Sequence, residues 1–226
     1  MTATLLLVHG AWHGSWCWEP LRRELDGLAV RTVDLPSSGT DPGSLGDLTD
    51  DARAVRAALT AIEGPVVVVA HSYGGIPVTE AAAAELGVVH LVYLAAFQLD
   101  VGESLVGGLG GAVPPWQGVQ ETAIRVSTPE QAFYDGVDPE LTEQSVARLG
   151  WQSVSSVTQP LSRAAWAGLP STYVVCTQDQ AIPPQAQEAM AQRAGEVLRL
   201  DAGHSPFLSQ PAALAALLRP IVDRAG

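Results

Sequence analysis

A serine between small residues follows a short apolar run in the first third of the chain. The run Val66–Val69 leads into the pattern G-x-S-x-G at positions 70–74, with Ala70 at the first glycine and Ser72 at the centre. In this pattern a strand turns sharply into a helix and lifts the serine hydroxyl above a sheet. The flanking residues must be small because backbones approach closely there. We predict that Ser72 is a nucleophile; the alternative is a tight turn with an incidental serine.

An aspartate and a histidine that could activate this serine come later. Asp179 follows the apolar run Thr172–Cys176, and His204 follows the run Val197–Leu200. The carboxyl ends of parallel strands meet at one edge of a sheet, where such sheets hold their ligands. We predict that His204 takes the serine proton as general base and that Asp179 orients the imidazole. The alternative for Asp179 is a cap ahead of a helix that begins near Pro183.

Backbone N–H donors for an oxyanion are expected from two places. Acyl transfer needs such donors, and each contributes about 10²–10³ in rate. The loop after the first apolar run can supply the N–H of Ala11, and Tyr73 supplies the N–H that follows the nucleophile. We interpret His9 as a brace for this loop. Trp12 and Phe207 are predicted to line the substrate pocket.

The elements that must position these residues alternate between strand-like and helix-like segments, which is typical of a parallel sheet built from βαβ units. The strands are near-continuous apolar runs, as expected when helices cover both sheet faces. The predicted strands are Leu5–Val8, Ala29–Val33, Val66–Ala70, Val89–Leu94, Thr172–Cys176 and Val197–Leu200. The predicted helices are Trp16–Leu25, Leu48–Ile62, one after Ser72, one over about 183–195, and one from about Pro211 to Val222 with Ser209 as its cap. The fold class is therefore α/β, with a mostly parallel sheet of about six strands.

Residues 98–168 interrupt this alternation. Gly102–Gly118 is rich in glycine, and two amphipathic stretches follow near Pro129–Tyr134 and Pro139–Leu149. We predict a core of residues 1–97 and 169–226 with a small cap insertion at 98–168; a mere surface excursion is the alternative. We also interpret the glycine-rich segment as a mobile lid.

Composition and charge exclude several kinds of partner. The formal net charge of −12 argues against nucleic acid, because phosphate binding depends on Lys and Arg. No apolar run approaches the ~20 residues that a membrane span needs.

The first residues lack a basic segment and a cleavage site, so we interpret them as a strand and not a signal peptide. Cys17 and Cys176 are predicted to be buried free thiols of a cytoplasmic protein, with a disulfide between them left open.

Four segments resemble one known group of proteins. They are Val8–Trp16, Val33–Pro42, Leu94–Phe97 and Tyr173–Asp179. They look like the plant methylesterase and hydroxynitrile lyase group of the α/β-hydrolase superfamily and its bacterial esterase relatives. The order serine, aspartate, histidine is also the α/β-hydrolase order, which differs from those of chymotrypsin and subtilisin. The resemblance implies the α/β-hydrolase fold, a triad of Ser72, Asp179 and His204, and oxyanion donors at Ala11 and Tyr73.

Two departures separate the activities of that group. Its hydroxynitrile lyases carry a lysine just after the catalytic histidine and a threonine in the first loop, where this chain has Ser205 and Gly10. A lysine ammonium would stabilise departing cyanide, so an esterase is favoured over a lyase. The serine nucleophile also disfavours haloalkane dehalogenase and epoxide hydrolase, which use an aspartate.

We therefore predict a serine esterase that cleaves a small carboxylic ester through an acyl-enzyme. A lyase reaction, C–C bond or thioester hydrolysis on the same triad, and a ligand-binding protein that retains the triad all stay open, because function depends on the pocket and not on the fold. No metal or organic cofactor is expected, since the sequence has no ligand cluster or dinucleotide fingerprint. The expected partner is a small-molecule ester; the sequence does not indicate the oligomeric state.

Overall fold

The computed structural model describes residues 2–108, 117–120 and 122–226. Its centre is a sheet of six parallel strands in the order β10-β9-β5-β4-β1-β2. The strands are β1 (Thr4–Val8), β2 (Val30–Val33), β4 (Val66–His71), β5 (Val88–Leu94), β9 (Ser171–Cys176) and β10 (Glu196–Leu200). The six predicted strands are confirmed, with no end displaced by more than about one residue, as expected of boundaries read from sequence.

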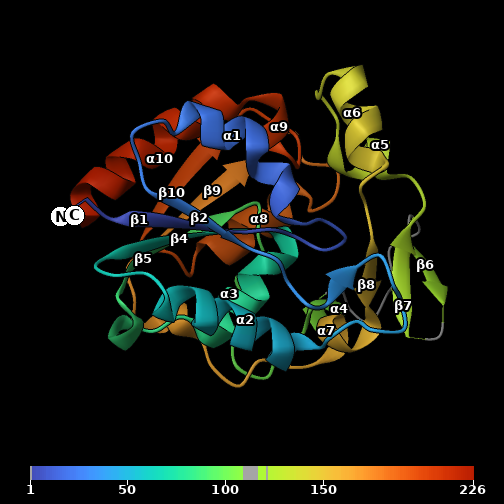
Figure 1. Ribbon diagram of the computed structural model, residues 1–226, viewed down its shortest axis with the longest axis horizontal. Helices are drawn as coiled ribbons and strands as arrows, with labels where there is room; N and C mark the ends of the chain where they lie inside the picture. The colour runs from blue at the N-terminus through green and yellow to red at the C-terminus, as the bar shows by residue number, and fades with distance from the viewer. Residues whose placement is uncertain (1, 109–116, 121) are drawn as a thin grey trace.

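Helices cover both faces of this sheet, as Figure 1 shows. One face carries α1 (Glu19–Glu24) and α10 (Pro211–Ala225), and the other carries α2 (Leu48–Thr60) and α3 (Gly75–Ala81). Helix α8 (Pro184–Ala191) packs against β9. Further short elements of the core include η3 (Ala84–Leu86) and α9 (Pro206–Ser209).

Two details of the predicted helices are corrected. The predicted helix Trp16–Leu25 is divided into a 3₁₀ turn, η1 (Ser15–Trp18), and α1. Pro20 has no N–H to continue the helical hydrogen bonds across the junction. Ser209 does not cap α10, because it ends α9 and its hydroxyl donates to the Ser205 carbonyl at 3.3 Å.

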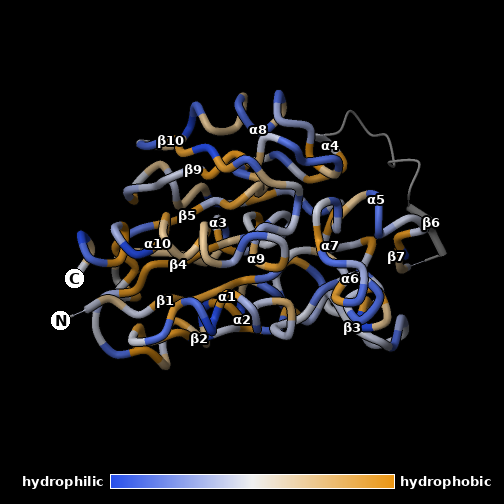
Figure 2. The backbone as a smooth tube through the Cα atoms, turned by 90° about the horizontal axis from the view of Figure 1, so that it is seen from above, coloured by the Kyte–Doolittle hydropathy of each residue, from blue (hydrophilic) through white to orange (hydrophobic). Residues whose placement is uncertain are grey.

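The core lies between the sheet and these helices. Every residue of β4 and of β9 is buried, and in Figure 2 the central strands are coloured as hydrophobic. Such strands are stable only when helices cover both faces, which explains their mostly apolar sequences. Cys17 and Cys176 are buried free thiols, as predicted.

Three strands from the segment between β5 and β9 join β3, which follows β2, in a second, antiparallel sheet of the order β3-β8-β7-β6. Its strands are β3 (Ser38–Gly39), β6 (Gln117–Gln120), β7 (Ala123–Val126) and β8 (Trp151–Ser153). The helices of this region are α4 (Leu105–Gly108), α5 (Pro129–Phe133), α6 (Pro139–Val146), α7 (Val154–Thr158) and η4 (Ala165–Ala167). Figure 1 shows β6, β7, α5 and α6 at the end of the molecule opposite the two termini. Residues 109–116 of the predicted lid lie outside the described residues.

Candidate active site

Ser72 lies just beyond the carboxyl end of β4, on a turn that continues through η2 (Ser72–Gly74) into α3. Its φ angle is 53°, in the left-handed region that residues other than glycine rarely adopt. A Cβ added at Gly74 would lie 2.4 Å from the carbonyl oxygen of His9. This close approach explains why the position two residues after Ser72 is a glycine. The packed surroundings hold the serine in its strained conformation.

The side chains of His204 and Asp179 meet Ser72 at this edge of the sheet. Ser72 Oγ lies 3.0 Å from His204 Nε2, and His204 Nδ1 lies 2.7 Å from Asp179 Oδ2. The loops that carry Asp179 and His204 follow β9 and β10, which are paired in parallel. Both side chains are buried. The three residues that the sequence singled out are therefore joined by two consecutive hydrogen bonds.

Four donors hold the carboxylate of Asp179 in one orientation. Its Oδ1 accepts the N–H groups of Ala181 and Ile182 at 2.7 and 2.9 Å. Its Oδ2 accepts from Gln187 Nε2 at 2.8 Å as well as from His204. Asp179 therefore stabilises the turn ahead of α8 and faces the imidazole at the same time, but it does not cap the helix, whose N-cap is Pro183 without a side-chain hydrogen bond.

Gln187 is a residue that the sequence analysis missed. It is fully buried on α8, and its side-chain oxygen accepts the N–H of Cys176 at 3.0 Å. Its Nε2 donates to the carbonyl of Ile182 at 2.8 Å in addition to Asp179. A polar residue on the inward face of a helix was the only signal in the sequence, and it does not identify the partner.

The loop after β1 lies directly against Ser72. A Cβ added at Gly10 would be 2.8 Å from Ser72 Cβ, so a side chain here would collide with the serine. His9 braces the loop, as predicted: its Nδ1 donates to the Gly10 carbonyl at 2.8 Å and its Nε2 accepts the Leu35 N–H at 3.0 Å. The loop is therefore held between the serine and the segment that follows β2.

The two predicted oxyanion donors belong to segments that flank Ser72. Ala11 follows Gly10 in the first loop and is buried. Tyr73 follows Ser72 in η2, and its side chain is fully buried. The arrangement places one N–H on each of two backbone segments next to the serine.

The two residues predicted to line the pocket have different surroundings. Trp12 stacks on Phe133 of α5 with ring centroids 5.5 Å apart, and Phe133 in turn lies 5.6 Å from the ring of His204. Phe207 is fully buried and packs against Trp18 at 4.6 Å and His71 at 4.8 Å. This packing assigns Phe207 to the wall behind the histidines and not to a pocket surface, because no part of its side chain is accessible.

Buried histidines surround the site. Burial lowers the pKa of His13 to about 3 and lowers the pKa of His71 well below its ordinary value. His71 donates from Nε2 to the main-chain carbonyl of His204 at 2.8 Å, and the two rings are 4.6 Å apart. A neutral His71 therefore supports the loop that carries His204 without placing a positive charge beside it.

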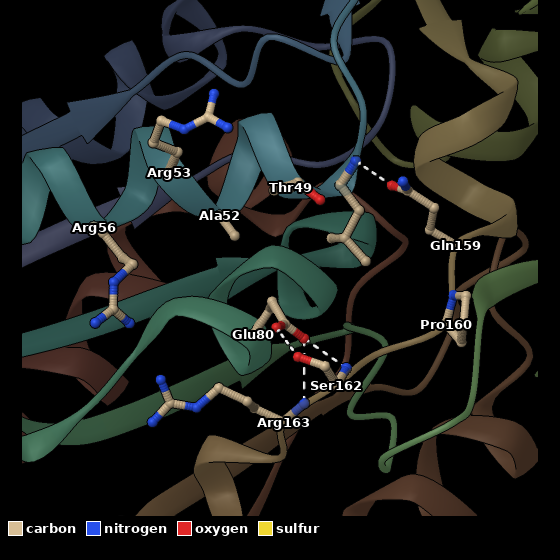
Figure 3. A pocket seen from close by; sticks show the side chains of 10 residues that line it. Thr49, Ala52, Arg53, Arg56, Glu80, Gln159, Pro160, Ser162 and Arg163 are labelled. Carbon is tan, nitrogen blue, oxygen red and sulfur yellow. Dashed lines mark hydrogen bonds between the residues drawn. The ribbon is translucent and has the colours of Figure 1, made fainter.

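A separate pocket of about 560 Å³ lies between α2 and the segment after α7 (Figure 3). Arg53, Arg56 and Arg163 line it, together with Glu80, which accepts the N–H of Ser162 at 2.8 Å. Ser72, Asp179 and His204 are all absent from the lining of this pocket, so it is not the candidate active site.

The part of the chain that the structure describes contains neither a metal-ligand cluster nor a membrane-spanning helix. Within 2–108, 117–120 and 122–226, no group of three or more His, Cys, Asp or Glu side chains could hold a metal ion. Among the helices that the structure describes, none has the length and hydropathy to cross a membrane.

Known proteins resemble this chain over almost its whole length. Residues 5–217 match the protein-family model described as the alpha/beta hydrolase family. The chain is 30% identical to the alpha/beta hydrolase nvfD of Aspergillus novofumigatus, over 95% of this chain and 94% of that protein. It is also 30% identical to Methylesterase 7 of Arabidopsis thaliana, over 97% of this chain and 96% of that protein.

Solved structures agree with these matches. A methylesterase from Arabidopsis superimposes with a TM-score of 0.80 at 26% identity, covering 98% of this chain and 99% of that chain. A pyrethroid hydrolase from Sphingobium faniae superimposes with a TM-score of 0.84 at 20% identity, covering 99% of this chain and 98% of that chain. At that identity the second likeness shows the fold alone.

Proposed function

This chain belongs to the alpha/beta hydrolase family, and from that membership we propose that it hydrolyses a small carboxylic ester at Ser72. The observation that carries the proposal is the pair of hydrogen bonds from Ser72 through His204 to Asp179, at 3.0 and 2.7 Å. A serine hydroxyl is a weak nucleophile until a base takes its proton, and that base works only in the correct tautomer. The contact of Nδ1 with a carboxylate supports a proton on Nδ1, which leaves Nε2 free to accept from the serine.

In the first half of the proposed reaction, Ser72 Oγ attacks the ester carbonyl carbon while its proton passes to His204 Nε2. The carbonyl oxygen becomes an oxyanion, which we propose is bound by the N–H groups of Ala11 and Tyr73. Asp179 stabilises the imidazolium that has formed. The tetrahedral intermediate then loses the alcohol, which takes the proton from Nε2, and an ester of Ser72 is left.

In the second half, a water molecule attacks the ester of Ser72 and gives its proton to His204 Nε2. The new tetrahedral intermediate releases the carboxylic acid, and the proton returns to Ser72 Oγ. No redox or cofactor chemistry is needed at any step. His204 thus acts as base in each attack and as acid in each collapse.

The surroundings of Ser72 favour an ester substrate over a cyanohydrin. The residue after His204 is Ser205, which is fully buried and carries no charge to stabilise departing cyanide. The close contact of Gly10 with Ser72 also leaves no room for the threonine that is expected in the lyases of the resembling group. Relatives named methylesterases support methyl esters as the first compounds to test.

We propose that residues 98–168 form the cap that limits substrate size. Phe133 of α5 supports this, because its ring lies against both Trp12 and His204. A bulky aromatic side chain beside the base would restrict the acyl or alcohol group that fits.

The two buried free thiols also fit a cytoplasmic location, because such thiols persist in a reducing compartment.

Turnover of short p-nitrophenyl esters and of aromatic methyl esters tests the proposal. We expect Ser72→Ala to lower kcat by at least about 10³-fold, since the nucleophile is lost. Ser209→Ala is the matched control, because this serine lies five residues after His204 and its hydroxyl contacts only the Ser205 carbonyl among the bonds described. Equal turnover by wild type and Ser72→Ala would reject the assignment of this site.

A further inference from the structure

A buried carboxylate that the proposed mechanism does not use lies behind the nucleophile turn. Asp51, in the first turn of α2, is fully buried. Its Oδ2 accepts from the hydroxyls of Tyr73 at 2.6 Å and Ser37 at 2.5 Å, and its Oδ1 accepts the Ser37 N–H at 2.8 Å. A carboxylate without such donors would be costly to bury. The donors and Asp51 therefore fix one another in position.

Tyr73 connects this carboxylate to the reaction site. Its side chain is fully buried, and its hydroxyl is anchored on α2 through Asp51. Its backbone N–H is one of the two proposed oxyanion donors. Because a tyrosine ring is rigid, fixing the hydroxyl at one end restricts the backbone at the other.

Gln152 of β8 extends the same set of hydrogen bonds to the first loop. Its Nε2 donates to Ser37 Oγ at 2.8 Å, and its Oε1 accepts the Trp12 N–H at 3.3 Å. The remaining positions of the amide contact Ser156 Oγ and Ser38 Oγ, both at 2.6 Å. All four hydrogen-bonding positions of this buried side chain are therefore used. Trp12 directly follows Ala11, the other proposed donor.

We propose that Asp51, Ser37 and Gln152 are positioning residues that set the separation of the two oxyanion donors. We call them the Asp51 network. One end of the network holds the hydroxyl of Tyr73, and the other holds the N–H next to Ala11. This inference rests on the proposed function, because the donors matter only if an oxyanion forms. Hydrogen bonds to a carboxylate are short and strong, which suits a device that must hold two segments within a fraction of an ångström.

The network also gives the second sheet a role at the site. Asp51 lies on α2, ahead of the insertion, and Gln152 lies on β8, inside the insertion, so the two halves come from different parts of the chain. Ser37, between them, lies just before β3, which pairs with β8. The spacing of the donors is therefore set where the two sheets meet.

The test removes one hydroxyl at a time and separates kcat from KM. Tyr73→Phe keeps the ring and deletes the contact with Asp51. We expect kcat for p-nitrophenyl acetate to fall about tenfold with KM changed by less than about twofold, because the loss is felt mainly in the transition state. Tyr93→Phe is the matched control: its hydroxyl is equally buried and bonds Thr79 Oγ1 at 2.7 Å, outside the Asp51 network. Tm is measured for both variants.

A second variant acts from the other end of the network. Gln152→Met removes the amide while keeping its length, and we expect a similar fall in kcat. The double variant should lose less than the product of the two single losses, because the residues act as a unit. If Tyr73→Phe does not fold, the kcat of Gln152→Met compared with that of Tyr93→Phe tests the inference.

Two results would overturn the inference in different ways. If wild-type turnover depends on Ser72 and both variants lose no more kcat than Tyr93→Phe at equal Tm, the network is only structural and the proposed function stands. If the wild type shows no turnover that depends on Ser72, the proposed function fails and the network has no oxyanion to serve.

Discussion

Asp51 and Asp179 are both buried aspartates close to Ser72, but they face different partners. Asp179 meets His204, two backbone N–H groups and Gln187. Among the residues that the structure describes, the Asp51 carboxylate accepts hydrogen bonds from Ser37 and Tyr73. Burial raises the pKa of Asp51 to about 6, although the hydrogen bonds from those two residues act in the opposite direction. The neighbouring Asp50 adds a smaller upward contribution. A carboxylate with this pKa makes stability depend on pH.

The sign of that dependence follows from the two states of Asp51. With a folded pKa of about 6 against 3.8 in the unfolded chain, the native protein holds a proton that the unfolded chain has released between these values. The contribution of Asp51 to the free energy of unfolding is therefore greatest below pH 3.8 and is lost as pH rises through 6, by as much as ~3 kcal/mol. We expect Asp51→Asn to gain stability relative to wild type from pH 4 to pH 7, measured by urea unfolding. A constant difference across that range would contradict the prediction.

At the scale of elements, the site is made by four connections that meet above the carboxyl ends of the strands. The loop after β1 presses on Ser72 through Gly10, and the turn at η2 presses on the same loop through Gly74. The loops after β9 and β10 deliver Asp179 and His204. Contacts between backbones are this close only where no side chain intervenes, so glycine at these two positions is a packing requirement.

Gly10→Ala tests this requirement. The added methyl group would lie 2.8 Å from Ser72 Cβ, so either the loop or the serine must shift. We expect a loss of about 1–3 kcal/mol in the free energy of unfolding, as is usual for overpacking, and a fall in kcat because Ser72 is displaced. Gly168→Ala is the control, since a Cβ there meets nothing within 4 Å. Equal kcat and stability for the two variants would show that the loop yields without cost.

For the molecule as a whole, negative charge is in large excess. The chain has 24 acidic residues against 12 basic ones, and the formal net charge is −12. Such an excess destabilises a compact state through repulsion between surface charges, while it keeps the protein dispersed. Several exposed ion pairs, such as Arg199 with Glu188 at 2.8 Å, contribute little against it because water screens them.

Salt should therefore stabilise this protein. Raising sodium chloride from 10 mM to 300 mM at pH 7.5 shortens the screening length, and a gain of about 1 kcal/mol would raise Tm by about 2–4 °C for a chain of this size. Choline chloride should act alike if screening is the cause. A Tm that is unchanged or lowered by both salts would contradict the expectation.

The central sheet and the residues with the most distinctive chemistry were predictable from the amino-acid sequence alone. Runs such as Val66–Val69 predict buried strands because their apolar character is local, and the observed strands agree closely. The segments around Ser72, Asp179 and His204 were recognisable because each combines a strand end with a reactive side chain. Their meeting follows from a rule about parallel sheets that needs no knowledge of side-chain packing.

The side chains that surround these residues became known only from the folded arrangement of the chain. Gln187, Asp51 and Gln152 carry no local signal, because their partners lie far along the chain or on another element. The two-residue strand β3 exists only because β8 pairs with it. Phe207 is buried behind His71 and not in a pocket, since packing and not hydropathy sets which way an aromatic ring faces. Local patterns report the periodicity of one segment, whereas the partners of a buried polar or aromatic group are chosen when segments distant in sequence come together.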